Sequence, residues 1–99
     1  MKLGVGKLNR AFENRVRLGI MAALAVREDL EFTGLKQMLE VTDGNLASHM
    51  TVLEQLRFVR VRKDFVGRKP RTRYTMTETG RKAFGEHLDA LERIIRAGQ

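Results

Sequence analysis

Apolar residues recur at helical spacing in four stretches of the chain, and the first stretch covers about residues 9–27. Val16, Ile20 and Leu24 share one face of this predicted helix, and Phe12 extends that face by one turn. Other apolar residues fill most of the remaining faces, so the helix requires burial on more than one side. In a chain of 99 residues, we expect a second subunit to cover part of it.

Two shorter helical stretches follow within about residues 33–57. Thr33 is the expected N-cap of the first, and Thr42 or Asp43 is the expected N-cap of the second. The apolar positions that should face inward are Leu35, Met38 and Leu39 in the first helix, and Leu46, Met50, Leu53 and Leu56 in the second. Two helices with one apolar face each, joined by a short turn, predict a helix-turn-helix.

Alternation of apolar and polar residues replaces helical spacing in about residues 58–77, which predicts a two-stranded β-hairpin. Val59 and Val61 alternate with arginines on the outgoing strand, and Tyr74 and Met76 share one face of the returning strand. Residues 67–71 contain a glycine and the only proline of the chain, so we expect this segment to form the connecting loop.

The last helical stretch covers about residues 78–97, with Thr77 as its expected N-cap and Glu78 at its positive end. Its apolar stripe can cover the first helix alone, but that helix has more apolar sides than one partner can bury. We therefore favour a dimer surface shared by the two terminal helices. The residues expected there are Phe12, Val16, Phe84, Leu88, Leu91 and Ile95.

One segment carries the whole formal charge excess of +7. Between Arg57 and Arg73 there are eight basic residues and one acid, Asp64, whereas acids and bases balance in the rest of the chain. This segment coincides with the predicted hairpin. A hairpin with such a density of arginine and lysine indicates a polyanionic partner.

Composition and length narrow the function classes. The chain is 42% hydrophobic and 31% charged, which is typical of a globular protein, and we expect one domain over residues 1–99. No cysteine is present, which removes disulfides, thiol chemistry and cysteine-based zinc sites. His87 and Asp89 provide too few ligands for a closed metal site. We expect neither metal nor cofactor, and no enzyme, because no nucleophile, base and oxyanion site can be assembled.

The chain shows no sign of a membrane or secretion signal. Lys2, Lys7 and Arg10 interrupt any apolar run near the N-terminus. The longest apolar stretch, residues 18–26, is far shorter than the roughly 20 residues that cross a bilayer. We expect a cytoplasmic protein with no membrane partner.

The order of helix, helix-turn-helix, hairpin and helix predicts a winged helix, a mainly α fold with a small β-hairpin, here with terminal dimerisation helices. Three strings in this order resemble small single-domain winged helix-turn-helix regulators of the MarR/ArsR type. They are RVRLGIMAAL at 15–24, TDGNLASHM at 42–50, and GRKPRTRY at 67–74 followed by TETGR at 77–81. The resemblance implies a homodimer held by the terminal helices, with one recognition helix at each half-site of double-stranded DNA.

The sequence departs from this family in two places. Thr51 and Val52 stand where basic residues are usual, so residues 45–56 contain no lysine or arginine. Arg57 stands where glycine is usual, at a helix end where glycine adopts a positive φ cheaply. We expect Arg57 to take that conformation at a cost of about 1 kcal/mol.

The candidate DNA-binding residues fall into two groups. On the recognition helix, a helical projection places the outward or flanking positions at Asn45, Ser48, Thr51, Val52 and Gln55. His49 is a further candidate at the boundary of this face, because it projects about 50° from the inward direction. Amides and hydroxyls there can read base edges in the major groove. In the hairpin, the expected phosphate or minor-groove contacts are Arg68, Lys69, Arg71 and Arg73, with Arg60 and Arg62 peripheral. His49 is expected to bond backbone or phosphate rather than a metal.

These observations favour a dimeric, sequence-specific regulator of transcription, expected to be a repressor that occludes a promoter. The alternative is a winged helix that serves as a protein-interaction module, with the basic hairpin on an acidic partner. The lack of cations on the recognition helix favours that alternative. A small-molecule effector can sit between the terminal helices and the winged domain, but no residue cluster identifies one.

Overall fold

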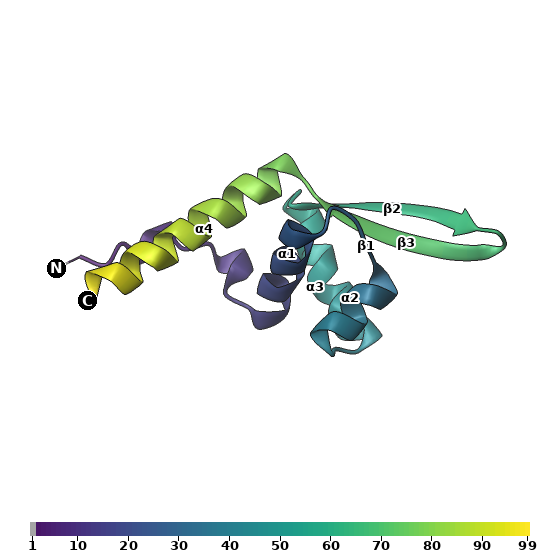
Figure 1. Cartoon of the computed structure of the whole chain (residues 1–99), viewed down its shortest axis with the longest axis horizontal. Helices are drawn as coiled ribbons and strands as arrows, with labels where there is room; N and C mark the ends of the chain where they lie inside the picture. Colours follow the sequence, from purple (N-terminus) through teal and green to yellow (C-terminus); the bar gives the residue numbers. More distant parts are fainter. Residues whose placement is uncertain (1) are drawn as a thin grey trace.

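A computed structural model describes residues 2–99 of the chain, which form four α-helices, two short 3-10 helices and three strands. In chain order these are η1 (Val5–Lys7), η2 (Arg10–Phe12), α1 (Arg15–Val26), β1 (Leu30–Glu31), α2 (Phe32–Leu39), α3 (Asp43–Gln55), β2 (Val59–Val66), β3 (Lys69–Met76) and α4 (Glu78–Ala97). The molecule measures 59 × 25 × 21 Å. Helices α1 to α3 form its centre, the β2–β3 hairpin projects to one side, and α4 extends with the N-terminal segment to the other (Figure 1).

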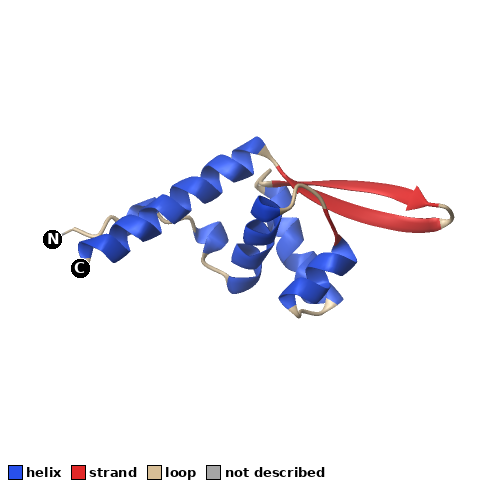
Figure 2. Ribbon diagram, viewed as in Figure 1, coloured by secondary structure: helices blue, strands red, loops and turns tan. Residues whose placement is uncertain are grey.

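The mainly α architecture with one hairpin is as predicted (Figure 2). The sheet contains one more strand than predicted, because β1 joins it in the order β1-β3-β2. Leu30 and Glu31 of β1 pair antiparallel with Tyr74 and Arg73 of β3. A two-residue strand has too little alternation to be recognised in a sequence, and its partner lies more than forty residues later.

The core lies where α1, α2 and α3 meet the base of the hairpin and the first half of α4. Its largest fully buried side chains are Phe12, Ile20, Met21, Leu24, Leu35, Leu46, Met50 and Leu53. The ring of Phe12 lies 5.4 Å from that of Phe58 and 5.3 Å from that of Phe84, measured between centroids. Phe12 therefore connects the N-terminal segment, the base of the hairpin and α4.

Helix α1 begins at Arg15, later than the predicted start near residue 9. The side-chain oxygen of Asn14 accepts hydrogen bonds from the backbone N–H groups of Val16 and Arg17, at 2.9 and 3.0 Å, and so caps the helix. Phe12 lies before this cap, on η2, rather than one turn earlier on the same helix. Its apolar character was a correct sign of burial, but its place on α1 was wrong.

Helix α2 also differs at its start and on its inner face. Its N-cap is Glu31, and Thr33 lies inside the first turn, because the helix begins directly after the residues that pair with β3. Leu35 is fully buried, whereas Met38, which was expected to face inward, is 55% exposed. The helix has only eight residues, and Leu35 is the one side chain that it buries completely.

Helix α3 follows the prediction closely. Thr42 is its N-cap and accepts a hydrogen bond from the backbone N–H of Asn45 at 3.1 Å. Leu46, Met50 and Leu53 are buried as expected, but Leu56 is 45% exposed, because it occupies the C-cap, where the chain leaves the helix.

The end of α3 contains the strained residue that the sequence predicts. Arg57 has a φ of 63°. Its N–H donates to the carbonyl of Glu54, and the N–H of Phe58 donates to the carbonyl of Leu53, at 2.9 Å each. These two bonds define a Schellman motif with arginine at the position that glycine usually occupies.

The hairpin has its predicted extent, but its returning strand is longer and its loop shorter than predicted. The pairing of β2 with β3 runs to Val66 opposite Lys69, so Gly67 and Arg68 alone form the loop. Gly67 has a φ of 64°, and a positive φ at the first loop residue is typical of a type II′ turn. Pro70 lies in β3 opposite Phe65, at a position where β1 no longer pairs with β3, so the missing N–H costs no ladder bond to β1.

Replacement of Arg57 by glycine should stabilise the protein. The Arg57→Gly variant removes a side chain from a left-handed conformation, so we expect the free energy of unfolding to rise by about 0.5–1 kcal/mol. Denaturation in urea, followed by circular dichroism, measures this change. Arg60→Gly on the neighbouring strand is the control and should lower stability. A loss of stability in Arg57→Gly would contradict the prediction.

Candidate nucleic-acid interface

The exposed face of α3 consists of short polar side chains. Asn45, Ser48, Thr51 and Gln55 are exposed, whereas Val52 is half-buried. The hydroxyl of Thr51 donates to the carbonyl of Ala47 at 2.9 Å, so its oxygen is left as an acceptor. This face offers hydrogen-bonding groups without charge, as expected from the lack of lysine and arginine in residues 45–56.

His49 is half-buried and bonds to a side chain of α1. Its Nδ1 lies 2.9 Å from Nη1 of Arg17, and a guanidinium only donates, so Nδ1 is the acceptor. Arg17 also donates from Nε to the carbonyl of Ala11 at 2.7 Å. This bond ties α3 to α1, and the expected bond of His49 to backbone or phosphate stays a prediction for its other ring nitrogen. Arg17, a lone cation on an otherwise apolar face, was the signal that the sequence offered for this bond.

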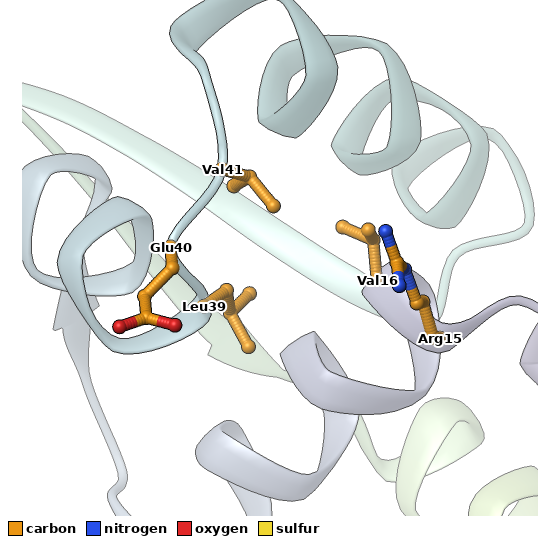
Figure 3. A pocket seen from close by; sticks show the side chains of 5 residues that line it. All are labelled: Arg15, Val16, Leu39, Glu40 and Val41. Atoms are coloured by element: carbon orange, nitrogen blue, oxygen red, sulfur yellow. The ribbon is translucent and has the colours of Figure 1, made fainter.

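An open groove adjoins the first turn of α3. Two adjacent cavities of about 300 and 540 Å³ share Arg15, Val16, Glu40 and Val41, which come from the start of α1 and the turn between α2 and α3. Val16 and Val41 point toward one another across the smaller cavity, and Arg15 lies beside Val16 (Figure 3). The larger cavity also reaches Asn45 and His49. The groove therefore combines one cation and one carboxylate with an apolar floor.

The outer face of the hairpin carries a wing ion network, defined by Arg62, Arg71, Arg73, Asp29 and Asp64. Arg71 binds Asp64 with both arms, Nε to Oδ1 at 3.0 Å and Nη2 to Oδ2 at 2.9 Å. Arg73 bridges the two acids, with Nη2 at 2.9 Å from Asp64 and Nη1 at 3.2 Å from Asp29. Arg62 approaches Asp29 at 3.5 Å. Two of the four predicted hairpin contacts, Arg71 and Arg73, are thus held by acids of the same chain.

These bonds keep the Asp64 carboxylate ionised. The hydrogen bond from Arg71, supported by the charges of Arg71 and Arg73, lowers the pKa of Asp64 to about 2 against the opposing effect of desolvation. The same hydrogen bond raises the pKa of Arg71 above its ordinary value. The Asp64–Arg71 pair therefore stays charged at any physiological pH.

The other two predicted hairpin contacts are placed differently. Arg68 and Lys69, here called the tip cations, are exposed at the end of the hairpin. Within residues 2–99 neither makes an ion pair, and the same holds for Arg60 at the base of β2. The ion pair between Asp64 and Arg71 was not predicted, because the expected five-residue loop does not place these two residues opposite each other. The observed two-residue loop places Asp64 directly opposite Arg71.

The residues predicted for a dimer surface divide into two sets. Phe12, Val16 and Phe84 are buried in the core of their own chain. On α4, Leu88 is 44% and Ile95 62% exposed, and Leu91 is half-buried. The N-terminal segment adds Leu3 and Val5, which are exposed, and η1 packs against α4. The accessible part of the predicted dimer surface thus lies on α4, with further exposed apolar residues on the segment beside it.

His87 fixes the N-terminal segment to α4. Its Nδ1 accepts a hydrogen bond from the backbone N–H of Asn9 at 3.0 Å, and its ring lies 5.3 Å from that of Phe12. The side chain is 3% exposed. In the sequence analysis His87 was considered only as a metal ligand.

Residues 2–99 contain no group of side chains that could hold a metal ion, and no helix among them is long and apolar enough to span a bilayer.

Comparisons with known proteins agree with this arrangement. The family described as "Winged helix DNA-binding domain" matches residues 16–95. An uncharacterized protein of Methanocaldococcus jannaschii is 37% identical over 79 residues, which cover 80% of this chain and 86% of that protein. The solved structure of a transcriptional regulator homologue from Pyrococcus horikoshii is 35% identical, with a TM-score of 0.84, over 90% of this chain and 88% of that one.

A more distant likeness extends to larger regulators. A MarR-like transcriptional regulator from Thermotoga maritima shares 24% identity and a TM-score of 0.63, over 85% of this chain and 59% of that one. At this identity the likeness shows the fold alone. The chain therefore belongs to the family of winged helix DNA-binding domains, and its predicted likeness to small winged helix-turn-helix regulators is confirmed.

Proposed function

We propose that the protein is a regulator of transcription that binds double-stranded DNA as a homodimer and represses by occluding a promoter. The observation that carries this proposal is the exposed polar face of α3 together with unpaired cations at the tip of the hairpin. A helix of about 10–12 Å diameter fits the major groove, and a basic hairpin beside it can follow the adjacent backbone or minor groove. The proposed site of action is the cytoplasm.

The proposed base-reading residues are those of the exposed face of α3. The amides of Asn45 and Gln55 can pair with adenine, and Ser48 and Thr51 can bond a base or a phosphate. His49 and Val52 are half-buried and border this face. Affinity for the backbone then comes from the hairpin, because residues 45–56 carry no cation.

The homodimer is proposed from the unpartnered apolar surface of α4. Leu88, Leu91 and Ile95 form a stripe that the described part of the chain leaves partly exposed, next to Leu3 and Val5. An apolar stripe that a protomer leaves open favours a symmetric pairing of two such surfaces. A dimer would present two recognition helices to half-sites about one helical turn apart.

A second candidate function is a protein-interaction module that uses the hairpin on an acidic partner. The uncharged face of α3 favours it, and so does the capture of Arg71 and Arg73 by acids of the same chain. Both candidates use the tip cations, so the nature of the partner separates them.

DNA binding should depend on salt and on the tip cations. If each of the four tip cations of a dimer neutralises one phosphate, log affinity should fall against log salt with a slope of about −4. Fluorescence anisotropy with a duplex from the region upstream of the gene measures this slope. Charge reversal in Arg68→Glu/Lys69→Glu should abolish binding.

The matched control for this experiment is Lys82→Glu/Arg93→Glu, which reverses two exposed charges on α4 opposite its apolar stripe. The control should bind as the wild type does. No binding by the wild type at low salt, or a slope near zero, would reject the DNA-binding proposal. Retention of an acidic protein partner by the wild type alone, in a pull-down, would then support the interaction module.

The dimer should depend on the α4 stripe. Ile95→Glu places a charge on a side chain that is 62% exposed in the protomer, so it should leave the fold intact and dissociate the dimer. Analytical ultracentrifugation should give the mass of two chains for the wild type and of one for the variant. Circular dichroism checks that the variant is folded. A folded Ile95→Glu variant that stays dimeric would place the interface elsewhere.

A further inference from the structure

The wing ion network uses the same donor geometry that a phosphate would use. Arg71 directs two parallel N–H groups at one carboxylate, with donor–acceptor distances of 3.0 and 2.9 Å. Guanidinium recognises phosphate with this same two-armed fork. Arg71 can therefore contact a DNA backbone in this way only after it leaves Asp64.

Arg73 is restrained from two sides. It lies between Asp64 and Asp29, and its side chain is 22% exposed, against 63% for Arg62. Its Nε and the Oδ1 of Asp29 are buried and have no hydrogen-bond partner within residues 2–99. The contacts to Asp29 are also the longer ones, at 3.2 and 3.5 Å. Asp64 is thus the stronger anchor, and Asp29 is the weaker.

The network lowers the positive charge that the hairpin presents to a partner. Three arginines face two aspartates, so the network contributes one net positive charge instead of three. Because Asp64 has a pKa of about 2, its ion pairs persist as the pH falls below the ordinary carboxyl value and are lost only near pH 2. A competing anion, rather than a proton, would have to release the arginines.

We propose that Asp64, assisted by Asp29, withholds Arg71 and Arg73 from the DNA backbone and so limits the sequence-independent affinity of the hairpin. This inference rests on the proposed DNA-binding function. In this arrangement Arg68 and Lys69 supply the backbone contacts, and Asp64 acts as a positioning residue that sets how many cations compete for phosphates. When the sequence-independent affinity is low, discrimination between DNA sequences depends more on the exposed face of α3.

A double-mutant cycle on Asp64 and Arg71 tests the proposal, with a duplex of unrelated sequence as the probe. Arg71→Gln alone should change affinity by less than about twofold, whereas Arg68→Gln should weaken it by about eightfold per wing at about 0.1 M salt. Asp64→Asn should tighten binding by about eightfold per wing and steepen the salt slope by about 0.9. In the double variant Asp64→Asn/Arg71→Gln, most of this gain should disappear.

Two controls complete the cycle. Asp89→Asn makes the same change of charge on an exposed residue of α4, and it should leave affinity near the wild-type value. Asp29→Asn releases the weaker anchor from outside the hairpin, and it should tighten binding by less than Asp64→Asn does. Thermal unfolding of each variant shows whether the hairpin and core remain folded.

Two outcomes would overturn the inference alone. Arg71→Gln could weaken binding as much as Arg68→Gln does, which would mean that Arg71 already contacts phosphate. Asp64→Asn could tighten binding equally with and without Arg71, which would reduce its role to simple repulsion. Both results require a wild type that binds DNA, so they leave the proposed function intact. A wild type that binds no duplex at low salt would instead reject the proposed function, and this inference with it.

Discussion

Helix α3, the β2–β3 hairpin and α4 meet at one polar junction, and their relative placement depends on it. The backbone N–H of Thr77 donates to the carbonyl of Phe58, at 3.0 Å, and the Thr77 hydroxyl donates to the carbonyl of Arg57 at 2.6 Å. The same hydroxyl oxygen accepts from the N–H of Gly80 at 2.9 Å, which caps α4. A Cβ on Gly80 would lie 2.1 Å from the carbonyl oxygen of Phe58, so only glycine permits this approach. Thr77 thus provides hydrogen bonds to the backbone at the end of α3, at the base of the sheet and at the start of α4.

Most of the fold could be predicted from the sequence, because its elements have clear local signals. The apolar stripe of α3, its N-cap Thr42 and the alternation in the strands each depend on residues that are close in sequence. The errors arose where a distant partner decides the structure. Strand β1 exists only because β3 pairs with it, and that pairing sets the start of α2 at the residue after Glu31. Phe12 was recognised as buried, but the cap formed by Asn14 separates it from α1.

The candidate site was less predictable than the fold, since charge counts do not reveal which charges are paired. The sequence located the whole charge excess in the hairpin, and the structure shows which of these cations are paired with acids and which are not. Arg68 and Lys69 are exposed at the tip, while Arg71 and Arg73 face Asp64 across a register that depends on the length of the loop. On α3 the projection from sequence placed Ser48 and Gln55 outward, and both are exposed. His49 is half-buried, as its boundary position predicts, but its bond to Arg17 was not foreseen, because that partner is contributed by another helix.

The short length of β1 has a consequence for how the protein behaves at high concentration. Between Lys69 and Thr72, at the tip end of β3, no strand of the described residues pairs with its outer edge, and the apolar Phe65 and Val66 lie exposed near the same end. An open edge with apolar neighbours invites strands from other molecules to add to the sheet. Pro70 removes one amide donor from this edge, and the tip cations Arg68 and Lys69 bring like charges to any copy that approaches. This edge of β3 is therefore protected against the addition of strands by the same segment that makes the hairpin basic.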